Sequence, residues 1–356
     1  MPIDHRGPAR PSARISGPAE LLQAIPYLLG FHPSDSLVLV GLRGRRLVVT
    51  ARLDLADSTQ PGVTAHTVAA ISRGGATVVV GVVYDREPEV TPRPWGGLAA
   101  VLADDAEEHG CELADLLLVS GRHWWSLLCT EPTCCPPEGL DLPDAPSEFA
   151  ATATVEGIVA LPDRAAVEAV LEPAPAAVLA ALEPLIEQFE HAAVAEVLAG
   201  HSTRSTRSLI RSLFAAARAA EAPAWNPPND ATVARFGVAL GSIPIRDAVW
   251  MAIDDRRLTG RALWRDLACR LPSPYDAPPL FLFGWSAWRA GDGTLANIAA
   301  ARAVDSDPGY SAADLLSGAL ANGVDPRRLP KLRARRRADS PAAQATVAVS
   351  ATRTKT

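Results

Sequence analysis

The 356-residue sequence lacks the features that mark secreted, membrane-spanning and nucleic-acid-binding proteins. Five cysteines, an odd number in a large chain, do not suggest a disulfide framework. Glycine, proline or charge interrupts the longest apolar runs, so no membrane span is expected, and the first residues contain no apolar signal-peptide core. A formal net charge of −6 gives no general affinity for nucleic acid or anionic lipid. These absences predict a cytoplasmic protein.

Lysine and aromatic residues are also scarce. Lysine occurs only at Lys331 and Lys355, so nearly all of the 34 basic residues are arginine. Together with frequent alanine, glycine and proline, this usage suggests a GC-rich bacterial genome. Aromatic residues make up 5% of a chain that is 48% hydrophobic, so the core must consist mainly of alanine, leucine and valine. A chain of this length forms one large or two ordinary domains.

The first half of the chain opens with a helical pattern and a hairpin pattern. Apolar residues at helical spacing predict a helix over 18–31, which Pro26 should kink or end early. Two strand-like segments joined by a turn at Gly44 predict a β-hairpin over 36–55. The second strand alternates between an apolar and a mixed face. The apolar face holds Leu47, Val49, Ala51, Leu53 and Leu55, and the mixed face holds Val48, Thr50, Arg52 and Asp54.

Strands and helices then alternate up to about residue 160. Apolar runs at 77–85 and 114–121 predict buried strands, and 63–75 and 96–110 have helical patterns. Alternation of this kind favours an α/β fold. We therefore predict an α/β domain over 14–160, a mixed sheet with flanking helices, after a disordered lead-in at 1–13.

The second half carries alanine-rich helical stretches separated by proline clusters, with no convincing strand. It predicts an all-α domain over 161–330. The remainder, 331–356, is a basic block without apolar periodicity and predicts a disordered tail. That tail is the one segment expected to contact nucleic acid or lipid, because no nucleic-acid-binding motif occurs elsewhere.

A helical hairpin is expected over 280–304, with its turn at 291–293. Its small residues and the following proline match the spacing of one tetratricopeptide unit, which lets paired helices approach closely. These residues are Gly284, Ala296, Ala303 and Pro308. Stable arrays need about three such units. An ordinary helical hairpin inside a bundle is therefore the alternative.

A polar cluster surrounds the predicted helix-to-strand turn LLGFHPSDS. His32, Asp35 and Ser36 lie too close in sequence to favour a catalytic triad, whose members usually come from separate loops. Asp35 and Ser36 can instead cap backbone N–H groups of the turn. With Arg52 and Asp54 on the paired strand, the cluster predicts a candidate site for a carboxylate or phosphate. The alternative is that Arg52 merely pairs with Asp54 or Asp35.

Three cysteines follow the second buried strand. Cys129, Cys134 and Cys135 lie within seven residues, and His123 precedes them. Three thiols and one imidazole could hold zinc, although the usual Cys-x-x-Cys spacing is missing. The alternatives are unpaired structural thiols and a local disulfide or redox pair. No other cofactor is predicted.

Several separated motifs resemble one family. LLQAIPYLLGFHPSDSLVLVGLRG followed by ARLDL resembles the opening of an actinobacterial family catalogued only as a domain of unknown function. WWSLLCTEPTCCPPEG resembles its middle segment, and IRDAVW with AWRAGDGTLANIAAARAVDSDPGYSAADLL resembles its helical half. The resemblance extends to about Pro330. It implies a cytoplasmic bacterial protein and supplies no catalytic residues.

Two functional hypotheses follow from the sequence. The first is a non-catalytic binding or adaptor protein with a protein partner on the helical domain, to be tested at Trp285 and Trp288. Its basis is a repeat-like hairpin in a chain without a complete catalytic motif. The second is an enzyme or a sensor of a small anionic metabolite or nucleotide that uses the polar cluster. The sequence specifies no reaction.

Overall fold

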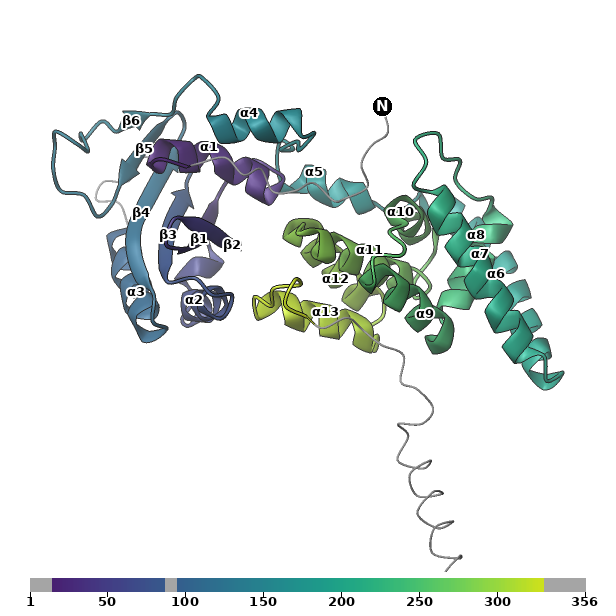
Figure 1. Cartoon of the computed structure of the whole chain (residues 1–356). Coiled ribbons are helices and arrows are strands. Elements are labelled where there is room, and N and C mark those ends of the chain that lie inside the picture. Colours follow the sequence, from purple (N-terminus) through teal and green to yellow (C-terminus); the bar gives the residue numbers. More distant parts are fainter. Residues whose placement is uncertain (1–14, 87–94, 330–356) are drawn as a thin grey trace, which may run out of the picture.

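The computed structural model describes residues 15–86 and 95–329. In Figure 1 the sheet half lies on one side and the helical half on the other, with α6 and α7 at the far end. The predicted lead-in at 1–13 and basic tail at 331–356 lie outside the described residues.

The sheet is mixed, as predicted, and has the strand order β2-β1-β3-β4-β5-β6. Only β3 and β4 pair in parallel, and the other neighbours are antiparallel. The strands are β1 (Ser36–Arg43), β2 (Arg46–Asp54), β3 (Val78–Tyr84), β4 (Glu112–Ser120), β5 (His123–Ser126) and β6 (Leu140–Asp141). The predicted hairpin is β1–β2, with Gly44 at φ +57° in its turn.

Helices cover both faces of the sheet, which explains why β3 is apolar on both sides. One face of the sheet is covered by α2 (Val63–Arg73) and α3 (Trp95–Glu108). Apolar side chains of these helices form one cluster with Leu37, Val79 and Val83 of the sheet. On the other face, α1 (Pro18–Leu29), Val38 and Val82 share a cluster with the helical half. A short 3₁₀ turn, η1 (Asp57–Thr59), links β2 to α2.

Two local expectations need correction. Of the two effects expected of Pro26, an early end of the helix is wrong, because α1 continues to Leu29 and is closed by Gly30 at φ +83°, and the kink stays a prediction. Leu47 does not share the cluster of Val49, because a register shift in the β1–β2 ladder sets it opposite Leu42, on the other side. A single extra residue in one strand reverses the direction of the side chains beyond it.

The helical half has no strand between 161 and 329, as predicted. Before this half, α4 (Glu148–Val155) packs on α1. The elements of the helical half are α5 (Arg164–Glu168), η2 (Ala169–Leu171), α6 (Ala176–Leu198), α7 (Ser202–Ala219), α8 (Asp230–Leu240), α9 (Ile243–Asp254), α10 (Arg261–Arg270), α11 (Ala277–Ala290), α12 (Gly293–Ser306) and α13 (Ser311–Ala321). One apolar cluster runs from the sheet into this half. The sheet half and the helical half therefore share one apolar core.

The predicted helical hairpin is α11–α12, and α11 is its buried centre. A Cβ at Gly284 would lie 3.1 Å from both Ala299 Cβ and Leu316 Cδ2, so the missing side chain permits close packing with α12 and α13. Trp285 packs edge-on against Trp250 and Trp288. Likeness to a tetratricopeptide unit stays a prediction.

Among the described residues, the stretch 164–198 is long and apolar enough, by length and composition alone, to cross a membrane. The helices α8 and α9 are long enough only if they are counted as one span, although the chain bends by 97° between them. Pro173 and Pro175 interrupt the first stretch, and α6 carries Glu183, Glu187 and Glu190. Charged side chains are costly within a bilayer.

Candidate functional site

The helix-to-strand joint separates the predicted cluster into two parts. The side chain of His32 is exposed, and its backbone N–H donates to the Leu161 carbonyl at 3.0 Å. Asp35 adopts a left-handed backbone at φ +44° and accepts a hydrogen bond from Arg86 Nε at 2.7 Å. The Arg86 guanidinium lowers the pKa of Asp35. Sequence reasoning missed Arg86, which follows β3.

Ser36, Arg52 and Asp54 do come together, at the paired ends of β1 and β2. Arg52 Nε donates to Ser36 Oγ at 2.9 Å, and Arg52 Nη2 lies 2.7 Å from Asp54 Oδ1. The Ser36 hydroxyl is buried and donates to the Ser34 carbonyl at 2.6 Å. That hydroxyl has no imidazole partner among the described residues, so a Ser–His–Asp arrangement is excluded there.

The Arg52 side chain lies at the edge of a large cleft between the two halves. It is 10% exposed and lines a cavity of about 1490 Å³ together with Val48 and Thr50 of β2. The other walls come from the end of α1, from α2 and α5, from the segment after α7, from α9 to α13, and from the segment after α13. The Thr50 hydroxyl is buried with no hydrogen-bond partner among the residues that the structure describes.

Arginines from both halves line this cleft. They are Arg52, Arg164, Arg256, Arg261, Arg289 and Arg327, whereas the acidic lining residues are Glu221 and Asp325. Several of these arginines also have a carboxylate partner; the Arg289–Asp254 pair, at 3.3 Å, is the most buried. The cleft therefore offers many N–H donors beside apolar walls.

Arg256 differs from the other arginines of the cleft. Its backbone is left-handed, at φ +56°, directly after α9. Within residues 15–86 and 95–329 it forms no ion pair, whereas its neighbour Arg257 pairs with Asp255 at 3.2 Å. A non-glycine residue in this conformation is uncommon and is often found where function requires it. No local sequence pattern marks Arg256, because its left-handed conformation arises where α9 turns towards α10.

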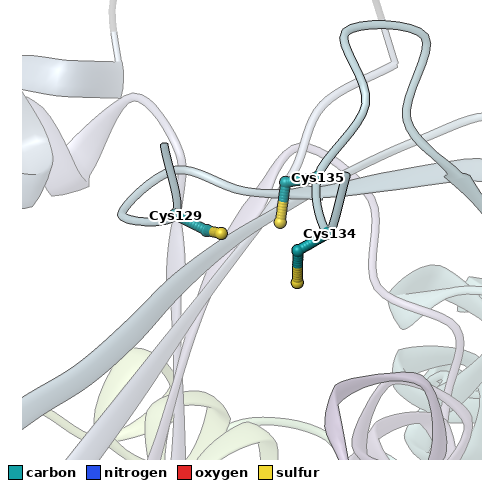
Figure 2. Close-up of side chains that lie close together, drawn as sticks. All are labelled: Cys129, Cys134 and Cys135. Carbon is teal, nitrogen blue, oxygen red and sulfur yellow. The ribbon is translucent and has the colours of Figure 1, made fainter. Parts of the chain in front are cut away.

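The three cysteines predicted as ligands also meet (Figure 2). Their sulfur atoms all lie within 4.8 Å of one another. His123 is not in this group; its Nε2 faces Asp141 Oδ1 at 3.4 Å. The backbone N–H of Glu131 and the thiol of Cys135 lower the pKa of Cys129, and the same contact raises the pKa of Cys135 to about 11.

These features define a two-part protein, in which a mixed sheet with flanking helices meets a helical body across an arginine-lined cleft. The chain belongs to the family described as Domain of unknown function (DUF4192), whose model matches residues 18–327. The match confirms the predicted membership in a family catalogued only as a domain of unknown function, and it covers both halves. Comparisons with curated proteins and with solved structures gave no match.

Proposed function

We propose that this protein binds a small molecule carrying a phosphate or carboxylate group in the cleft between its halves. One observation carries the proposal: arginines from the sheet and from the helical half line the same cavity, with few acidic side chains among them. Guanidinium groups bind such anions through paired N–H donors. Clefts between packed units are also common sites for small ligands.

The ion pairs within the cleft leave donors for a ligand. A guanidinium carries five N–H groups, and one carboxylate engages at most two of them. Arg52 directs Nε to Ser36 and Nη2 to Asp54, contacts that fix the orientation of its planar group. Arg256, without an ion pair among the described residues, is the strongest candidate for direct contact with an anion.

The cleft also has apolar walls. Leu28, Phe31 and Trp288 line it beside the arginines. Its volume of about 1490 Å³ exceeds that of most small-molecule pockets, which are on the order of 300–1,000 Å³. A nucleotide, with an aromatic base and a phosphate chain, matches both kinds of wall and leaves room for bridging water.

Calorimetric titration with ATP and with inorganic pyrophosphate, at constant ionic strength, tests the proposal. We expect Arg52→Gln and Arg256→Gln to weaken binding roughly tenfold or more, since a hydrogen bond to a charged group contributes about 1.5–3 kcal/mol. Arg257→Gln is the matched control, because Arg257 does not line the cleft. Absence of binding to both probes, or an equal loss in the control, would overturn the proposal.

A protein partner on the helical half is a second candidate, favoured by an exposed apolar surface. Near the end of α6, Val194, Val197 and Leu198 are 57%, 65% and 83% exposed. Trp285 and Trp288, by contrast, are only 2% and 4% exposed, so neither offers a surface to a protein partner, although Trp288 also lines the cleft. Affinity capture should lose its partner with Leu198→Asp and keep it with Val155→Asp, a change at an exposed position of α4. Equal recovery by both variants would reject this surface.

A further inference from the structure

We propose that Cys129, Cys134 and Cys135 form a zinc site in which three thiolates hold the ion and a fourth ligand comes from solvent. This site is independent of the cleft. It is supported by the mutual approach of the three sulfur atoms and by the hydrogen bonds that fix the backbone of each ligand.

The sulfur separations suit a zinc ion. With Zn–S bonds of about 2.3 Å, two sulfur ligands of one tetrahedral ion lie about 3.8 Å apart. The three sulfur atoms here are separated by no more than 4.8 Å. Closing that difference needs small side-chain rotations, and Cys134 is exposed while the other two are half-buried.

The backbone positions are fixed from two sides. On the β5 side, the N–H of Cys129 donates to Ser126 Oγ at 3.0 Å, and that hydroxyl donates to Asp115 Oδ1 at 2.7 Å. On the other side, the N–H groups of Cys134 and Cys135 both donate to the Glu131 carbonyl, at 3.1 and 2.8 Å. Figure 2 shows the resulting gathering of the three sulfurs. Such pre-organisation reduces the entropy lost on binding an ion.

The returning end of the loop is also fixed. Trp125 Nε1 donates to the Pro137 carbonyl at 3.1 Å, and the ring lies so close to Gly139 that a Cβ there would be 2.4 Å from Trp125 Cε2. Gly139 has φ +85°, which glycine tolerates best. Hydrogen bonds therefore hold both ends of the segment between Ser126 and Gly139 against the sheet, and an ion bound to its cysteines would cross-link the middle of the segment.

A metal explains three thiols better than a disulfide does. A disulfide would use two sulfurs and leave the third without a role. Adjacent residues such as Cys134 and Cys135 form a disulfide only with strained geometry. Three sulfur ligands favour zinc and softer ions over magnesium or calcium. Binding would release the thiol protons to solvent, because the ligands must be thiolates. With three protein ligands, the fourth position stays open to water at the exposed side of Cys134.

Zinc titration of the full chain tests the site. The protein is purified with a phosphine reductant, stripped with a chelator and titrated with Zn²⁺ against a chromophoric competitor. We expect one equivalent of zinc in the wild type and at least tenfold weaker binding in Cys129→Ser, Cys134→Ser and Cys135→Ser. Cys269→Ser and His123→Gln are controls that should bind as the wild type does. Cobalt should give a thiolate-to-metal charge-transfer band in the wild type and in both controls, and a weaker band in the three variants, each of which keeps only two of the thiolates.

Three results would overturn the site. They are a stoichiometry below about 0.2 equivalents, unchanged binding in the three serine variants (an adventitious ion only), and a disulfide between two of these cysteines in protein isolated without reductant. Circular dichroism separates loss of the ligand from loss of the fold, since none of the three cysteines is fully buried and the variants should melt as apo wild type does. None of these outcomes bears on anion binding in the cleft.

Discussion

A methyl group added at Gly323 should weaken the contact between the helical half and the sheet half. Gly323 follows α13 with φ +62°, and a Cβ there would lie 2.5 Å from the carbonyl oxygen of Ala70 in α2. Both residues also line the cleft. The clash is with a backbone atom, so rotation of a side chain cannot relieve it.

Two costs add in Gly323→Ala. A left-handed backbone costs an alanine roughly 1 kcal/mol relative to glycine. Forcing a carbon into a packed contact costs about 1–3 kcal/mol more. We therefore expect the variant to lose about 2–4 kcal/mol of the free energy that holds the α13 end against α2.

Gly200→Ala separates these two costs. Gly200 follows α6 in the equivalent position, has φ +71° and donates its N–H to the Val197 carbonyl, as Gly323 does to that of Leu320. Nothing lies within 4 Å of a Cβ at Gly200. Its alanine variant should therefore lose only the conformational cost of about 1 kcal/mol.

Urea unfolding measures the difference between the two variants, and hydrogen exchange of α2 and α13 locates it. Faster exchange should appear in both helices of Gly323→Ala and in neither helix of Gly200→Ala. Equal destabilisation of the two variants, within about 0.5 kcal/mol, would refute the reasoning.

Three further outcomes are expected. Trp285→Ala, which removes a ring that is 2% exposed, should cost about 3–5 kcal/mol in urea unfolding; a loss below about 1 kcal/mol would contradict its place in the core. Burial raises the pKa of Asp276, so acid protonates this group in the folded chain before it does so in the unfolded chain. Asp276→Asn keeps an acceptor for Ser306 Oγ, so it should have a larger free energy of unfolding than wild type at pH 7. This difference in stability should shrink as the pH falls through the pKa of Asp276, and a difference that grows would contradict the prediction. Arg86→Gln should leave the melting temperature nearly unchanged, because its pair with Asp35 is exposed, and a large decrease would show that the pair holds the joint.

Local patterns were sufficient to predict most of the secondary structure. The β1–β2 hairpin and the α11–α12 hairpin are each specified by glycines at a turn and by the periodicity of flanking apolar residues. The helix does not end at Pro26, because a proline late in α1 removes only one N–H donor and the apolar contacts of the following Leu29 compensate. The bulge beside Leu42 could not be predicted, since both registers place apolar residues against a core.

The candidate sites depend on tertiary structure to different degrees. The three cysteines are near neighbours in the chain, so the sequence identified them, but only the folded strand shows that His123 faces Asp141 and not the sulfurs. The pairing of Arg52 with Asp54 followed from their alternation on one strand. The ion pair of Asp35 with Arg86 could not be predicted from local sequence, because Arg86 follows β3 and the sheet brings it to the start of β1.

The sequence by itself determined the family, the mixed sheet, the helical second half and the cysteine group, because each is encoded by short-range patterns. The tertiary structure alone decided that Arg52 and Arg256 line one cavity. Their proximity depends on the docking of two halves through a shared apolar core, and contacts between residues so far apart in the chain leave no periodic signal in a single sequence.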